Sequence, residues 1–251
     1  QMTAGSKAHL AGLVRTGALV GLAAVALQIP ASAGYLGGDV ASAFDPLYVR
    51  LMLETTLGCS SLLAAAGFIM AVWLPRLTAK YHTPTGGLIC LLIATAFAVH
   101  GHATTGGMVT SLLLVVHLAC VAVWLGAFLP LHRLCRLATD DPVALLELAQ
   151  TGRRFAQVGS ITVALLLLSG GILAAFLTGS VTAMVATDYG LALSGKVILV
   201  SGLLGLAALN RFRLVPAVDR GERAAAERLG LSVRLEMLIA LAIMLVTSLL
   251  T

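Results

Sequence analysis

The chain has 251 residues, of which 59% are hydrophobic and only 11% are charged, and its mean hydropathy is +1.00. A soluble domain carries about 25% charged residues, so this chain has too little polar sequence to cover a water-exposed surface. The composition excludes a soluble globular protein and predicts an all-α, polytopic transmembrane bundle. The net charge of +5 comes from short basic loops, which reflect membrane orientation and not nucleic-acid binding.

Seven apolar segments approach or exceed the length of about 20 residues that a membrane-spanning helix needs. They predict helices at roughly residues 10–30, 48–74, 86–102, 108–131, 155–179, 189–211 and 233–251. We expect these helices to form a single transmembrane domain over residues 1–251. The chain contains no P-loop, so we expect no direct coupling to ATP within it, and we expect no catalytic residues.

The first segment allows two interpretations. Lys7 and Arg15 precede its apolar run, and residues 31–33 read Ala-Ser-Ala, which resembles a cleavable signal peptide. We interpret the segment as a spanning helix and keep cleavage as the alternative. Gly17 and Gly21 form a GxxxG motif, which allows two helices to approach closely.

The basic residues predict the orientation of the helices. If the seven segments alternate across the membrane, 14 of the 16 lysines and arginines fall on one side. The positive-inside rule then places the N-terminus in the cytoplasm and Thr251 in the periplasm. The last basic loop, 212–232, carries charges of both signs, and part of it could form a short amphipathic helix. The residues on the basic side are Lys7, Arg15, Arg76, Lys80, Arg133, Arg136, Arg153, Arg154, Arg211, Arg213, Arg220, Arg223, Arg228 and Arg234.

Four ionisable residues fall inside different apolar segments, where such residues are energetically costly and usually functional. They are Glu54, His100, His117 and Lys196. At the helical rise of 1.5 Å per residue, all four lie within about 5–15 Å of the periplasmic interface. We therefore expect a polar layer in the periplasmic half of the bundle, built from four helices.

The histidines in this layer are candidate metal ligands. His100 and His102 would point about 200° apart on a continuous helix, but Gly101 and the nearby Gly106-Gly107 pair allow the helix to end and both rings to turn towards one ion. The predicted metal ligands are His102 and His117, together with His100. Imidazole suits copper, zinc or haem iron.

Sulfur donors and an aromatic residue accompany these histidines. His117, Cys120 and Trp124 follow an i, i+3, i+7 spacing and share a helix face. Met108 and Met52 are candidate thioether ligands near the same level, and thiol or thioether sulfur beside imidazole favours copper(I). We expect Met52, Met108, Cys120 and Trp124, together with Glu54 and Lys196, to surround the site or line an ion pathway.

Structural roles are open for the same residues. His117 could hydrogen-bond a backbone carbonyl across the bundle, His102 could be a solvated loop residue, and Glu54 could pair with Lys196. Methionine, cysteine and tryptophan in a bundle more often pack than bind ligands. Glu236, early in the last segment, is most simply explained by snorkelling to the interface or by a pair with neighbouring Arg234.

Several stretches together resemble the CopD family of bacterial copper-resistance and copper-transport membrane proteins. They are YVRLMLETTLGCSSLLAAAGF, GHATTGG, VHLACVAVWLGAFLPL, RFAQVGSITVALLLLSGGILAAFL, TDYGLALSGKVILVSGLLGLAALNR and VRLEMLIALAIMLVTSLL. The similarity covers most of residues 48–251. One departure is Gly126-Ala127, where the family often has two glycines after the tryptophan.

The resemblance implies copper movement across the bacterial inner membrane, with copper ions as the cargo and a periplasmic copper chaperone as a possible partner. Two other functions stay open at this point. Histidines on adjacent helices at similar depth also suit a b-type haem of electron transport. A copper-binding assembly or sensor subunit that does not move the ion would have the same ligands.

Overall fold

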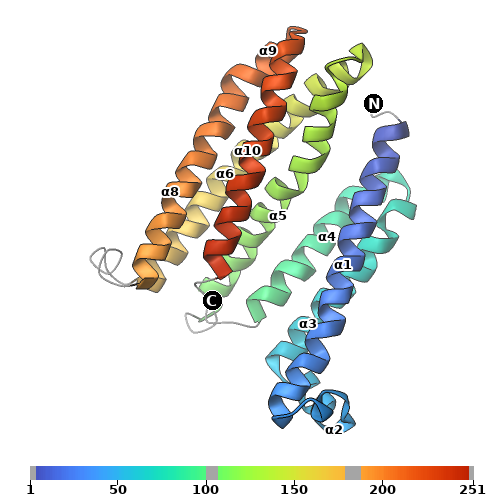
Figure 1. Cartoon of the computed structure of the whole chain (residues 1–251), viewed down its shortest axis with the longest axis vertical. Coiled ribbons are helices and arrows are strands. Elements are labelled where there is room, and N and C mark those ends of the chain that lie inside the picture. Colours follow the sequence, from blue (N-terminus) through green and yellow to red (C-terminus); the bar gives the residue numbers. More distant parts are fainter. Residues whose placement is uncertain (1–3, 100–106, 179–187, 249–251) are drawn as a thin grey trace. The chain divides into compact units, whose positions relative to one another are not determined.

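A computed structural model of the chain describes residues 4–99, 107–178 and 188–248, and the regular elements in these ranges are all helices (Figure 1). Seven of the described spans are long and apolar enough to cross a membrane: Ala4–Gly37, Thr56–Arg76, Ala79–Val99, Gly107–Leu137, Pro142–Phe176, Gly190–Asp219 and Arg223–Ser248. The expected all-α, seven-span polytopic fold is therefore confirmed. The direction in which the spans cross the membrane stays a prediction.

The described helices form two compact units. The N-terminal unit comprises residues 2–119, and the C-terminal unit begins at Cys120 and continues to the end of the chain. The boundary falls within one long helix, α5 (Gly107–Leu137). That a single domain covers residues 1–251 stays a prediction.

The N-terminal unit is built around α3 (Thr56–Trp73), which packs against α1 (Ala4–Gly37) and α4 (Ala79–Val99) (Figure 1). A Cβ atom on Gly21 of α1 would lie 2.4 Å from the ring of Phe68 in α3, so the Phe68 ring packs directly on the Gly21 backbone. Gly17 faces open space. Only Gly21 of the GxxxG motif therefore serves the packing of α1 on α3.

Short elements connect α1 to α3. The turn after α1 leads into η1 (Ala41–Phe44), where the backbone N–H of Ser42 donates to Asp39 Oδ1 at 2.7 Å. This hydrogen bond lowers the pKa of the exposed Asp39 carboxyl. The helix α2 (Pro46–Leu53) follows, with Asp45 as its N-cap, and the Asp45 carboxylate accepts from the N–H of Leu47 at 2.8 Å.

The segment expected at 48–74 is interrupted, because α2 ends before α3 begins. Thr55 has extended backbone angles (φ −83°, ψ 167°), and its side chain accepts from the N–H of Gly58 at 3.2 Å. That geometry is a helix N-cap, so a new helix starts at Thr56. After α3, the short η2 (Leu74–Arg76) completes the second span.

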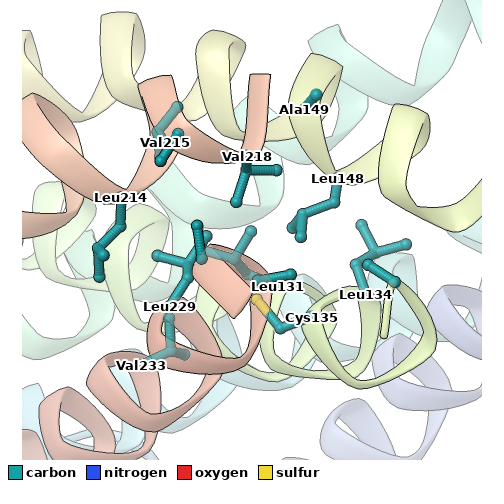
Figure 2. Close-up of a cluster of buried hydrophobic side chains, with 14 of the residues drawn as sticks. Leu131, Leu134, Cys135, Leu148, Ala149, Leu214, Val215, Val218, Leu229 and Val233 are labelled. Carbon is teal, nitrogen blue, oxygen red and sulfur yellow. The ribbon is translucent and has the colours of Figure 1, made fainter. Parts of the chain in front are cut away.

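The C-terminal unit contains the larger core. Its helices are the second part of α5, α6 (Pro142–Thr178), α8 (Asp188–Leu209), a π-helical turn η4 (Asn210–Leu214), α9 (Val215–Asp219) and α10 (Arg223–Ser248). Figure 2 shows buried side chains from α5, α6, η4, α9 and α10 meeting in this core. They include Leu131, Leu134, Cys135, Leu148, Leu214, Val218, Leu229 and Val233.

The predicted loop 212–232 is mostly helical. The sixth span continues through η4 and α9 to Asp219, and the chain reverses near Gly221, which has φ +87°. Helix α10 begins at Arg223, ten residues before the expected start of the last segment. The boundary prediction was wrong here because small and apolar side chains in the basic segment, Val215, Val218, Ala226 and Leu229, pack into the core.

Candidate functional site

Two of the three predicted metal ligands, His100 and His102, lie outside the described residues. Residues 4–99, 107–178 and 188–248 contain no group of three histidine, cysteine, aspartate or glutamate side chains placed to hold a metal ion. The histidine site therefore stays a prediction that depends on residues 100–106.

The third predicted ligand, His117, lies on α5 and is half-buried. It follows the first residue of the helix, Gly107, by ten residues, or about 15 Å at the α-helical rise. Two residues further on, the carbonyl of Ala119 lies 3.9 Å from the Cys90 Sγ of α4, which acts as a weak hydrogen-bond donor. This contact holds α4 against the part of α5 that carries His117.

The two residues that share a face of α5 with His117 are buried. Cys120 is 7% exposed and Trp124 is 6% exposed. Trp124 belongs to the core of the C-terminal unit, next to Phe128. Its environment is that of a packing residue.

A groove of about 370 Å³ lies between α4 and α5 within the N-terminal unit. Its wall consists of residues near the end of α4 and near the start of α5, which are the two helix ends that adjoin residues 100–106 in the sequence. The lining residues are Leu91, Thr95, Ala98, Val99, Met108, Ser111, Leu112 and Val115. Met108 is 79% exposed, so its thioether is accessible at this groove.

The other two predicted residues of the N-terminal unit lie on or beside α2. Met52 is 1% exposed and packs inside the unit. Glu54 follows the last residue of α2 and accepts a hydrogen bond from the Arg50 Nε at 3.0 Å. Both side chains of this ion pair are exposed, at 81% for Arg50 and 60% for Glu54.

The expectation that Glu54 lies inside a spanning helix was therefore wrong. The second span begins at Thr56, because Thr55 caps a new helix directly after Glu54. The Glu54 carboxylate instead pairs with Arg50 of the preceding helix α2. A tuning role for Glu54 at the metal site stays a prediction.

Lys196 belongs to the C-terminal unit. It lies on α8, is half-buried, and follows the start of the sixth span, Gly190, by six residues. That separation corresponds to about 9 Å along the helix. The layer that was expected to join Lys196 with residues of the first four helices stays a prediction.

The structure shows a buried polar group that the sequence analysis did not identify. The Asn210 Nδ2 donates a hydrogen bond to Glu236 Oε1 at 2.9 Å. The two residues are 9% and 3% exposed. The simplest interpretation of Glu236, a pair with Arg234, was wrong. Arg234 lies on the exposed side of α10, and its side chain points about 200° away from that of Glu236, because the two residues are two positions apart on one helix.

The local backbone positions this group. Asn210 is the first residue of the π-helical turn η4, and π-turns inside α-helices occur frequently at functional sites. The next residue, Arg211, donates hydrogen bonds to the Ala156 carbonyl and the Ser160 hydroxyl of α6. The turn thereby directs one polar side chain towards α10 and the next towards α6. In the sequence, only the presence of Asn210 and Glu236 in apolar segments indicated this group. Their pairing could not be predicted, because it depends on how the helices pack.

Comparisons with known proteins identify relatives of this chain. Residues 149–250 match the family model described as Copper resistance protein D. The copper resistance protein D of Pseudomonas syringae pv. tomato is 34% identical over 120 residues, which are 45% of this chain and 39% of that protein. No solved structure matches this chain.

Two further relatives match over more of this chain. The inner membrane protein YebZ of Escherichia coli is 28% identical over 86% of this chain and 75% of its own length. The copper transport protein CutJ of Bacillus subtilis is 28% identical over 78% of this chain and 38% of its own length. The matched region thus spans about two fifths of the Pseudomonas and Bacillus proteins.

These findings agree with the architecture. The seven described spans and the membrane-protein relatives confirm the expected location, a multi-pass protein of the bacterial inner membrane. The match of residues 149–250 begins within α6 and includes all of α10, so it covers 11 of the 20 buried residues that form the core of the C-terminal unit. The family-model match and these relatives support the resemblance to the CopD family that the sequence indicated.

Proposed function

We propose that this protein moves copper ions across the bacterial inner membrane and binds copper through His102, His117 and His100 in the periplasmic half of the bundle. The family match carries the proposal, because it is joined by relatives named for copper resistance and copper transport. The seven spans supply the membrane-crossing scaffold that such a function requires.

The chemistry of the N-terminal unit supports a copper site near residues 100–106. The groove between α4 and α5 adjoins these residues in the sequence and contains the exposed thioether of Met108. Thioether and imidazole together suit copper(I), whereas imidazole alone also accepts copper(II). His117 lies further along the same helix, so an ion bound near the groove and an ion bound at His117 would occupy successive positions along α5.

Copper binding to purified variants tests the ligands. We expect His102→Ala and His117→Ala each to lower the stoichiometry or affinity of copper binding, measured by competition with a chromophoric chelator. His82→Ala is the matched control, because the His82 ring is exposed and its Nε2 lies 3.0 Å from the carbonyl of Leu77. Unchanged binding in both ligand variants would overturn the site.

The same preparation separates the proposal from haem binding. A copper transporter purifies without a Soret band, whereas a b-type cytochrome shows one. A Soret band lost in His102→Ala or His117→Ala would replace the copper proposal with bis-imidazole haem ligation.

A further inference from the structure

The buried carboxyl group of Glu236 is the starting point. Glu236 follows the first residue of α10 by thirteen residues, which places it about 20 Å along the helix, and it is 3% exposed. An ionised carboxylate buried in an apolar bundle costs several kcal/mol unless it is paired. Among the described residues, the ion pairs are Arg50–Glu54, Arg153–Asp219 and Arg220–Glu222, and none of them includes Glu236.

The hydrogen bond from Asn210 to Glu236 leaves a second polar atom of this pair, the Asn210 side-chain oxygen, without a partner. Asn210 Nδ2 donates to Glu236 Oε1, while Asn210 Oδ1 is buried and has no hydrogen-bond partner in the structure. A carboxylate cannot donate to that oxygen, but a carboxylic acid can. A proton on Glu236 Oε2 would therefore satisfy Asn210 Oδ1 and would also remove the buried charge.

Ser232 adds a second buried polar group without a partner, one helical turn before Glu236. It precedes Glu236 by four residues, so the two share a face of α10. Its Oγ is buried and has no hydrogen-bond partner in the structure. A hydroxyl can both donate and accept, so Ser232 is suited to stabilise either protonation state of a neighbouring carboxyl.

The donor set fits a proton better than a metal ion. A metal of the first transition series or calcium needs several ligands at short distance, and the part of the chain that the structure describes has no cluster of three histidine, cysteine, aspartate or glutamate side chains. A protonated carboxyl and an amide can instead form two hydrogen bonds with each other, from the amide N–H to one carboxyl oxygen and from the carboxyl O–H to the amide oxygen.

Two of the charged or titratable groups on the surrounding elements have other partners, and a third lies far along its helix. Arg211 of η4 bonds to α6, and the His132 ring of α5 lies 3.2 Å from the Gly230 carbonyl. Lys196 of α8 precedes Asn210 by fourteen residues, or about 21 Å. The remaining titratable or charged residues of α5, α6, η4, α9 and α10 are Arg133, Cys135, Arg136, Glu147, Arg153, Arg154, Arg213, Asp219, Arg223, Glu227, Arg228 and Arg234.

We propose that Glu236 and Asn210 form a proton-binding site in the C-terminal unit and that Glu236 releases and rebinds this proton when the protein moves copper. In the binding step, a hydronium ion transfers its proton to Glu236 Oε2 and becomes water, and the new O–H donates to Asn210 Oδ1. The coupling to copper rests on the proposed function, whereas the proton site itself does not.

Infrared difference spectroscopy on the purified protein tests the proton site without copper. At neutral pH we expect a carbonyl stretching band of a protonated carboxyl that is absent from Glu236→Gln and retained in Glu227→Gln. Glu227 lies on the same helix and is exposed, so its variant is the matched control. In Asn210→Ala the band should move to higher frequency, because the hydrogen bond to the carboxyl is lost. A spectrum of Glu236→Gln identical to that of the unmodified protein would overturn the site.

Folding of the Glu236→Gln variant can be checked separately. Glutamine has the shape of glutamate and can donate to Asn210 Oδ1 through its own amide, so we expect it to elute from size-exclusion chromatography like the unmodified protein. If it does not fold, the frequency shift in Asn210→Ala decides the same question. A band that does not move in Asn210→Ala would contradict the acid–amide pair.

Copper uptake into proteoliposomes tests the coupling. We expect the uptake rate of the unmodified protein to change when a pH gradient is imposed, and the ratio of the rates with and without the gradient to fall to one in Glu236→Gln. A gradient dependence retained in Glu236→Gln would refute the coupling while leaving copper transport standing. If the unmodified protein takes up no copper under any gradient, the proposed function and the coupling both fail, and the infrared result alone decides the proton site.

Discussion

A single hydroxyl group, that of Thr55, determines where the second membrane span begins. Its Oγ1 accepts from the Gly58 N–H and donates to the Met52 carbonyl at 2.6 Å, so it connects the end of α2 to the start of α3. Because an N-cap satisfies a backbone donor that otherwise has no partner in the helix, removing it typically costs about 1 kcal/mol.

We therefore expect Thr55→Ala to lower the free energy of unfolding by about 1 kcal/mol. Denaturant titration of the purified protein in detergent, followed by circular dichroism, measures this change. Thr55→Ser retains the hydroxyl and should stay close to the unmodified protein. Equal stability of Thr55→Ala and Thr55→Ser would show that the cap does not stabilise α3.

At this scale, the sequence identified which residues are unusual but not what they contact. Glu54 and Glu236 are both acidic residues in apolar surroundings, and both were given plausible partners. The structure pairs Glu54 with Arg50 of the preceding helix α2 and pairs Glu236 with Asn210, 26 residues away. The second pairing could not be predicted, because it depends on a π-turn at Asn210 and on how α8 and α10 pack.

The connection between α2 and α3 depends on the backbone as well as on the cap. Gly58 is buried in the first turn of α3, and a Cβ atom there would lie 2.4 Å from the carbonyl oxygen of Leu53 and 2.5 Å from its Cα. A clash with backbone atoms cannot be relieved by a side-chain rotation. The angle between α2 and α3 therefore requires glycine at this position.

We expect Gly58→Ala to destabilise the protein by about 1–3 kcal/mol, the usual cost of overpacking. The melting temperature in detergent, monitored by circular dichroism, is the readout. Gly87→Ala is the control, because Gly87 lies on the exposed side of α4 with nothing within 4 Å of an added Cβ. A melting temperature of Gly58→Ala equal to that of Gly87→Ala would contradict the close approach.

The sequence predicted the number of spanning helices better than it predicted the residues at which they begin and end. Hydropathy marks the part of a helix that lies in lipid, whereas residues 211–228 include eight charged residues and still contribute Val218 of α9 to the core. Such a segment is amphipathic, so a search for apolar runs ends too early. The interruption between α2 and α3 was missed for the opposite reason, because both helices are apolar and only the cap residue separates them.

For the whole molecule, composition was enough to predict a membrane protein, because a chain with so few charges has no other stable environment, and the apolar segments were enough to predict seven spans. The grouping of the helices was not predictable, since it depends on interhelical contacts such as those of Gly21 with Phe68. Residues 100–106 carry two of the predicted ligands and adjoin the groove that Met108 lines. The copper proposal therefore depends on chemistry in the N-terminal unit and on a family match that lies in the C-terminal unit.

Copper uptake by the purified, reconstituted protein is the most direct test of the account. We expect sealed proteoliposomes containing the unmodified protein to accumulate radioactive copper faster than empty liposomes, and vesicles containing His117→Ala to fall towards the rate of empty liposomes. Vesicles containing His82→Ala should match the unmodified protein. Copper binding without accumulation would contradict transport and would instead indicate an assembly or sensor subunit that holds copper without moving it.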